Sequence, residues 1–174
     1  TGTQRPHEYI AYTPPTSGTY CFAMRRFAGA TTPEIELFIR PDGPGGNPEY
    51  NIPSSSLLDP ANGPKVMAVA AIWHNNWATG PQESFSSQGP TNTSKFATAR
   101  VEPAISGPDG TIDYDDTSAF GTSFASPHVA GCAALIRAAK PALTAAQTRT
   151  KLETEVIDMG TIGKDNIFGW GRLN

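Results

Sequence analysis

Residues 121–131 read Gly-Thr-Ser-Phe-Ala-Ser-Pro-His-Val-Ala-Gly, and this run constrains the chain more than any other segment. Small apolar residues follow Ser123 at helical spacing, which predicts a helix from Ser123 to about Ala139. The unpaired N–H groups and positive dipole end of a helix's first turn favour negative charge. Ser123 therefore lies where an attacking hydroxyl would create an oxyanion, to which its own N–H can donate. A simple helix cap is the alternative role for Ser123.

Three segments resemble motifs of the subtilisin-like serine peptidases. Residues 121–131 are similar to the nucleophile motif of that family, and Ser-Phe-Ser-Ser-Gln-Gly-Pro at 84–90 resembles its Ser-Phe-Ser-Ser-x-Gly-Pro segment. Residues 166–174 resemble the closing segment of the family, which packs back on the domain. At 102–110 the match is partial, because Glu102 and Ala104 stand where the family has lysine and aspartate. The resemblance is close over residues 60–174 and loose over 8–60.

The resemblance implies acyl transfer, with Ser123 attacking a peptide carbonyl and Gly121, Thr122 and Ser123 shaping the oxyanion and substrate-backbone site. In subtilisin the catalytic residues come in the chain order Asp, His, Ser. The family's Asp-Ser/Thr-Gly and His-Gly-Thr-His motifs do not occur between residues 1 and 120, nor does a strand ending in Gly-Asn that would supply the oxyanion asparagine. We therefore expect the C-terminal part of a serine endopeptidase domain, inactive when isolated.

The histidines of the chain do not replace the missing base. His7 lies in a polar lead-in, and His74 follows an apolar run without a glycine-rich partner motif. His128 lies five residues after Ser123 on the same predicted helix, so the two side chains point in different directions. We expect His128 to be a packed, hydrogen-bonded structural residue. Asn75 and Asn76 are predicted to be turn residues rather than oxyanion donors.

Composition and charge exclude several classes of function. A net charge of −3 without a Lys/Arg run argues against a nucleic-acid partner, and the absence of 18 consecutive apolar residues argues against a membrane span. Cys21 and Cys132 lack metal-site spacing, and no cofactor is indicated; Cys132 is expected to be a buried free thiol, although a bridge to Cys21 stays open. Bound calcium and substrate preference also stay open. The resemblance implies a secreted or extracellular protein.

The pattern along the chain predicts two regions. Residues 8–60 alternate in strand-like fashion, with strands at Thr19–Phe27 and Glu34–Arg40. Residues 1–60 are therefore predicted to form an antiparallel β insertion or partial β-sandwich. Residues 61–174 are predicted to be the C-terminal half of a doubly wound α/β domain. In this half Val66–Ile72 is apolar on both faces like a covered parallel strand, and Thr144 opens a second helix to about Glu155.

The exposed edge of Val66–Ile72 is expected to pair with the missing N-terminal half of the domain, or with a second copy as a homodimer. The substrate would be a polypeptide. A different class of function is a binding or assembly module derived from a peptidase, with Ser123 idle. A third is a carbohydrate-binding β-sandwich, suggested by the aromatic residues Tyr9, Tyr12, Tyr20 and Phe22, although alternating aromatics more often form a core.

Overall fold

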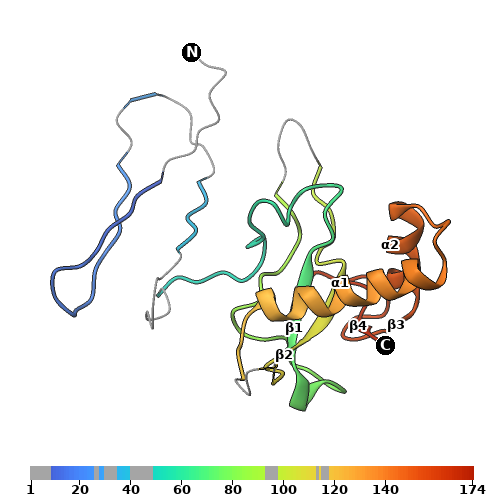
Figure 1. Ribbon diagram of the computed structural model, residues 1–174. Coiled ribbons are helices and arrows are strands. Elements are labelled where there is room, and N and C mark those ends of the chain that lie inside the picture. Colours follow the sequence, from blue (N-terminus) through green and yellow to red (C-terminus); the bar gives the residue numbers. More distant parts are fainter. Residues whose placement is uncertain are drawn as a thin grey trace. The chain divides into compact units, whose positions relative to one another are not determined.

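The computed structural model describes residues 9–25, 28–29, 35–39, 49–92, 98–112, 114 and 118–174 (Figure 1). The chain divides into two compact units, Thr1–Leu37 and Phe38–Asn174. Within the described residues, every helix and strand belongs to the second unit. In chain order these are β1 (Val69–Trp73), the 3₁₀ helix η1 (His74–Asn76), β2 (Ile105–Asp109), α1 (Thr122–Ala139), α2 (Ala145–Thr154), β3 (Val156–Ile157) and β4 (Arg172–Leu173).

The four strands form one sheet in the order β1-β2-β4-β3. β1, β2 and β4 run parallel, and the short β3 pairs antiparallel with β4. Ala70, Ala71 and Ile72 in β1 are buried, as expected for a strand covered on both faces. The predicted strand Val66–Ile72 begins later than expected, because the N–H of Val66 donates to the carbonyl of Gly63 and closes a turn.

Helix α1 packs on β1 and β2 and crosses in front of them in Figure 1. The contact is close at Gly107, where an added Cβ would lie 2.5 Å from the carbonyl oxygen of Ala125. Ile105, Val129 and Leu152 form the buried core between β2 and the two helices. The observed helix, Thr122–Ala139, confirms the sequence-based helix to within one residue.

The C-terminal elements also follow the sequence pattern. Thr144 caps α2 with a capping box in which its side chain and that of Gln147 bond each other's backbone N–H groups. The closing segment lies along β2: the N–H of Trp170 donates to Ala104, and the N–H of Ser106 donates to Gly171. The segment therefore packs back on the domain, as the resemblance implied.

The outer edge of β1 is partly covered by the chain itself. At Ala71 the N–H donates to Ser86 Oγ at 3.0 Å, and the carbonyl accepts from the N–H of Glu83 at 2.9 Å. Ile72 and Gln82 form an isolated antiparallel bridge beside them. The edge expected to be bare is thus bonded at Ala71, so pairing of this edge with another chain would be restricted to its remaining groups.

The first unit does not confirm the predicted β insertion. The described parts of the two expected strands, residues 19–25 and 35–39, carry no assigned strand. The Tyr20 hydroxyl donates to the carbonyl of Thr16, and the Tyr20 ring meets the Tyr12 ring edge-on with centroids 5.7 Å apart. Alternating side chains alone were not enough to predict strands here, because a strand also needs a hydrogen-bonded neighbouring strand. The four aromatic side chains are all exposed: Tyr9, Tyr12, Tyr20 and Phe22.

The domain boundary near residue 60 stays a prediction. The compact units divide between Leu37 and Phe38, and the N–H groups of Ser55 and Ser56 bond Gly89 and Gln88 within the second unit. In the described part of the chain, no helix is both long and apolar enough to span a membrane.

Candidate functional site: the start of helix α1

The candidate site lies where β1 and β2 end. The two strands run parallel and in register, with Trp73 paired to Asp109, so their carboxyl ends meet at one edge of the sheet. The N–H of Gly121, the residue before α1, donates to Asp109 Oδ1 at 3.0 Å. The beginning of α1 is therefore fixed at this edge, which is where open α/β sheets carry their binding sites.

Ser123 is exposed on the first turn of α1. Gly121 precedes the helix with φ 147° and ψ 150°, a conformation that favours glycine. A Cβ on Gly121 would lie 3.1 Å from Ser123 Oγ, so the glycine also leaves space at the hydroxyl. The N-cap residue of α1 is Gly121, and among the described residues no side chain caps the helix. The alternative that Ser123 is a helix cap is therefore wrong. The arrangement leaves the dipole end of α1 facing an accessible hydroxyl.

The histidines do not form a base for Ser123 in the part of the chain that the structure describes. His74 follows β1, and its Nδ1 lies 3.2 Å from the carbonyl oxygen of Asp109; since a carbonyl only accepts, Nδ1 donates. His128 Nδ1 likewise donates to the carbonyl of Phe124 at 2.8 Å. The expected hydrogen bond of His128 is confirmed. The prediction that His128 is packed is wrong, because the residue is exposed on the outer side of α1. His7 lies outside the described residues.

Asn75 and Asn76 form the turn expected of them. They complete η1, and the carbonyl of Asn76 accepts the N–H groups of Thr79 and Gly80. A backbone role of this kind agrees with the turn reading.

Asp109 is a residue of this site that the sequence analysis missed, and its charge affects the nearby carboxyl of Glu83. Asp109 is fully buried, and its Oδ2 has no hydrogen-bond partner among the described residues. Burial, and secondly the charge of Asp109, raise the pKa of the Glu83 carboxyl above its ordinary value. The sequence offered only a weak signal for Asp109, an aspartate followed by glycine in Gly107-Pro108-Asp109-Gly110, inside the segment that matches the family in part.

The serine-rich loop at 84–90 supports this edge of the sheet. Ser86 Oγ accepts the N–H of Ala71 in β1, and the side-chain amide of Gln82 donates to Ser86, Ser87 and Ile167 at 3.0, 3.4 and 3.0 Å. Ser86 and Gln82 are buried. The loop therefore satisfies backbone groups of an edge strand and ties it to the C-terminal segment.

Glu102 takes the place of the family's lysine without loss of charge compensation. Its carboxylate is buried and lies 3.6 Å from both Arg149 and Lys164. The negative charge of Glu102, just before β2, is thus matched by Arg149 from α2 and by Lys164, which lies just before the closing segment. No cluster of three or more His, Cys, Asp or Glu suited to a metal occurs in the residues described.

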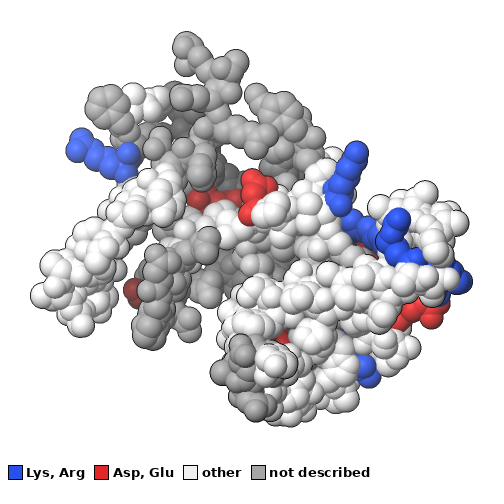
Figure 2. All heavy atoms as spheres, viewed as in Figure 1, with Lys and Arg blue, Asp and Glu red and all other residues white. Residues whose placement is uncertain are grey.

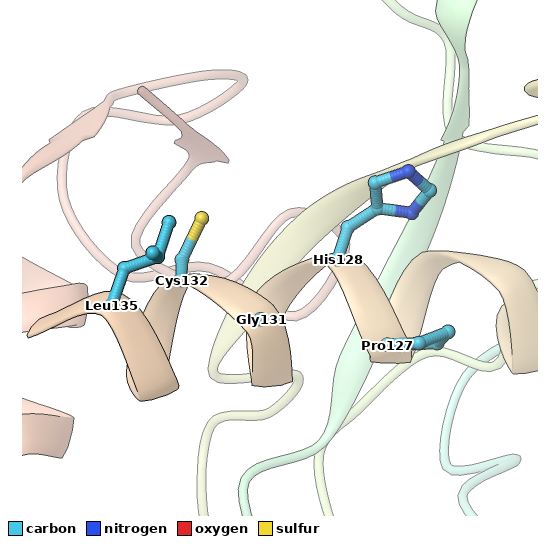
Figure 3. Close-up of a pocket in the computed structure, with 5 residues that line it drawn as sticks. All are labelled: Pro127, His128, Gly131, Cys132 and Leu135. Atoms are coloured by element: carbon cyan, nitrogen blue, oxygen red, sulfur yellow. The ribbon is translucent and has the colours of Figure 1, made fainter. Parts of the chain in front are cut away.

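A shallow apolar groove runs along the outer side of α1. Figure 3 shows His128, Cys132 and Leu135 projecting from one side of the helix, and Pro127 and Gly131 complete the lining. Leu135 is 71% exposed, and Ala125 and Val129 are the buried residues of α1. Figure 2 shows a broad surface without charged atoms on the face where Figure 1 places α1. The described residues therefore leave an apolar surface of α1 uncovered at this groove.

Both cysteines are free thiols. Cys132 is half-buried at the groove rather than fully buried as expected, because the outer side of α1 is open.

The chain is similar to several known proteins. A match to the subtilase family spans residues 45–171. The extracellular serine protease of Serratia marcescens is 46% identical over 54 residues, covering 31% of this chain and 5% of that protein. Subtilisin amylosacchariticus of Bacillus subtilis subsp. amylosacchariticus is 34% identical over 129 residues, covering 74% of this chain and 30% of the relative.

The solved structure of Sphericase superposes with a TM-score of 0.54 at 28% identity, over 67% of this chain and 42% of Sphericase. The chain thus spans less than a third of the length of the two sequence relatives. Since the family match covers most of the chain and the fold agrees, this protein belongs to the subtilase family.

Proposed function

We propose that this chain carries the nucleophile of a subtilisin-like serine endopeptidase, and that the nucleophile is Ser123. The observation that carries the proposal is the exposed Ser123 hydroxyl on the first turn of α1, behind a glycine whose missing side chain leaves space beside it. The strand ends and the helix dipole converge there, as a site for developing negative charge requires.

The reaction is acyl transfer to serine and then to water. Ser123 Oγ attacks the peptide carbonyl while its proton passes to a histidine base, and the resulting oxyanion accepts the N–H of Ser123. The base returns the proton to the leaving amine as the C–N bond breaks. Water then attacks the acyl-enzyme by the same route and releases Ser123. Gly121 and Thr122 shape the approach of the substrate backbone.

The histidine base and its orienting aspartate come from a stretch of the parent protein that this sequence does not include. Neither His74 nor His128 bonds Ser123 in the residues described, and each ring instead donates to a backbone carbonyl. The isolated chain is therefore proposed to lack significant peptidase activity.

The same missing stretch is the partner proposed for the apolar face of α1. A helix whose 18 residues include a single Lys or Arg, and of which two residues are buried, has the composition of a helix inside a domain. Covering it with the remainder of the peptidase domain removes the Leu135 side chain from water. Without that remainder, we expect two copies of the chain to associate through this face or through the free groups of the β1 edge.

Two further parts of the proposal concern location and the N-terminal region. Secretion is proposed because relatives such as the protease of Serratia marcescens are named extracellular. Residues 1–60 are proposed to be a β-rich insertion whose strands pair only in the intact domain.

A non-catalytic binding or assembly module is the second candidate function. The absence of the aspartate and histidine motifs favours it. The gene sequence upstream of Thr1 distinguishes the two, since motifs of the Asp-Thr-Gly and His-Gly-Thr-His type there belong to the enzyme.

An organophosphonate serine probe tests the enzyme directly. In the full-length protein we expect the label to map to Ser123 by peptide mass spectrometry and to disappear in Ser123→Ala. Ser126→Ala is the matched control, because Ser126 is exposed one turn further along the same helix. Label on another residue, or unchanged labelling of Ser123→Ala, would show that Ser123 is not the nucleophile.

A further inference from the structure

We propose that Asp109 is the positioning residue of this site: its buried carboxylate holds the backbone of Gly121 and thereby sets the place of Ser123. The inference rests on the proposed role of Ser123 as nucleophile. It concerns a residue that acts through the backbone and does not itself touch the substrate.

The first argument is the hydrogen bond itself. Asp109 is the last residue of β2 and is fully buried, so its side chain is held by the sheet. Its Oδ1 accepts the N–H of Gly121, twelve residues further along the chain, at 3.0 Å. Gly121 is the N-cap residue of α1, and its carbonyl accepts the N–H of Phe124 at 2.8 Å. A single carboxylate thus connects the rigid end of the sheet to the first turn of the helix that carries Ser123.

The second argument is that the residues just before α1 are also anchored to the ends of β1 and β2. Ser118 Oγ donates to the carbonyl of Gly110 at 2.9 Å, and the ring centroids of Phe120 and Trp73 lie 6.3 Å apart. A Cβ on Gly110 would lie 2.6 Å from atoms of both rings, so the glycine admits them. Asp109 completes this attachment at the residue where the chain turns into α1.

The third argument is the unused oxygen. Asp109 Oδ2 is buried without a partner among the described residues, and a buried carboxylate with half its capacity unfilled adds little to stability. The nearby carboxyl of Glu83 adds repulsion, since Asp109 raises its pKa. A residue that stability alone would not favour at this position is expected where it serves a site.

The first test measures the Gly121 amide in the present chain by NMR hydrogen exchange. Asp109→Ala should speed exchange of this amide by about 10- to 100-fold, the loss expected for a hydrogen bond to a charged acceptor. Asp109→Asn keeps an acceptor oxygen and should restore most of the protection. Ser106→Ala is the control, because it removes the part-buried hydrogen bond that Ser106 Oγ in β2 donates to the carbonyl of Phe168 at 3.0 Å, and does not touch Gly121.

The second test measures catalysis in the full-length protein. Asp109→Ala should lower kcat by about 10- to 100-fold with little change in KM, and Asp109→Asn should recover much of the loss. Should the alanine variant fail to fold, Asp109→Leu takes its place, because leucine fills the space of the aspartate without an acceptor oxygen and should therefore give the same faster Gly121 exchange and lower kcat. Unchanged Gly121 exchange in Asp109→Ala, or equal kcat losses for Ala, Asn and the Ser106 control, would overturn the inference. Failure of the proposed function is separate: it is seen as an unlabelled Ser123 with Gly121 exchange still dependent on Asp109.

Discussion

Two identical substitutions, Gly107→Ala and Gly131→Ala, are expected to have opposite effects on stability. At Gly107 the new methyl group would lie 2.5 Å from the Ala125 carbonyl oxygen and 3.1 Å from its carbon. Both atoms are helix backbone, so α1 must shift from the sheet rather than rotate a side chain. Overpacking of this kind costs about 1–3 kcal/mol of stability. Because the contact is with rigid backbone, we expect Gly107→Ala to lower the free energy of unfolding by about 3 kcal/mol.

At Gly131 an added methyl would meet no atom of the described residues within 4 Å beyond the adjoining backbone of α1 itself. Alanine in a helix interior is more stable than glycine by about 0.5–1 kcal/mol, so Gly131→Ala should stabilise the chain. The assay is urea unfolding followed by circular dichroism, with each variant compared to the unsubstituted chain. For a chain of this size, about 3 kcal/mol corresponds to a fall in Tm of about 6–12 °C.

The matched pair also tests the covering of α1. In the full-length protein, where the proposed partner segment lies on the groove, Gly131→Ala should no longer stabilise, because the methyl then meets packed atoms. Equal stability of the two variants in the isolated chain would refute the close contact of α1 with β2. A gain from Gly131→Ala that is identical in both proteins would refute the covering of the groove.

Three other predictions follow from single contacts. Because the pKa of Glu83 is raised above its ordinary value of 4.5, the stabilising contribution of this residue is complete below pH 4.5 and is lost as the pH rises through the raised pKa. Glu83→Gln should therefore match the parent chain at acid pH and be more stable in urea at neutral pH. Equal stability of the two chains at both pH values would contradict the shift. Glu102→Ala removes the buried carboxylate that Arg149 and Lys164 face, and should lower the free energy of unfolding by about 1–3 kcal/mol. An unchanged urea midpoint would rule this out. Leu135→Lys should reduce self-association seen by light scattering, whereas a parent chain that stays monomeric at high concentration would argue that its apolar face needs no partner.

The sequence was most informative where local signals determine the structure. The helix over 122–139 follows from small-residue spacing, and α2 follows from the reciprocal bonds between Thr144 and Gln147, which need no tertiary contact. The strand β1 was found from its apolar run, but its start was misplaced because the Gly63–Val66 turn competes for the first residues.

Features that depend on distant partners could not be predicted in this way. Asp109 bonds a backbone N–H from another element, and a lone aspartate carries no periodic signal. His128 was expected to be packed because the resemblance implied a structural histidine, whereas here the residue is exposed on the outer side of α1. The strands expected before residue 41 rest on alternation alone, and their described parts have no paired neighbour.

Peptide hydrolysis by three purified proteins tests the central claim, that Ser123 is a nucleophile activated from outside this chain. We expect the full-length protein to cleave a peptide substrate, and both its Ser123→Ala variant and the isolated chain to be inactive. In subtilisin, the type protein for this chemistry, loss of the serine or of the histidine lowers kcat by on the order of 10⁶. Hydrolysis by the isolated chain that survives further purification and is lost in Ser123→Ala would contradict the claim, and would assign the base to a histidine within these 174 residues.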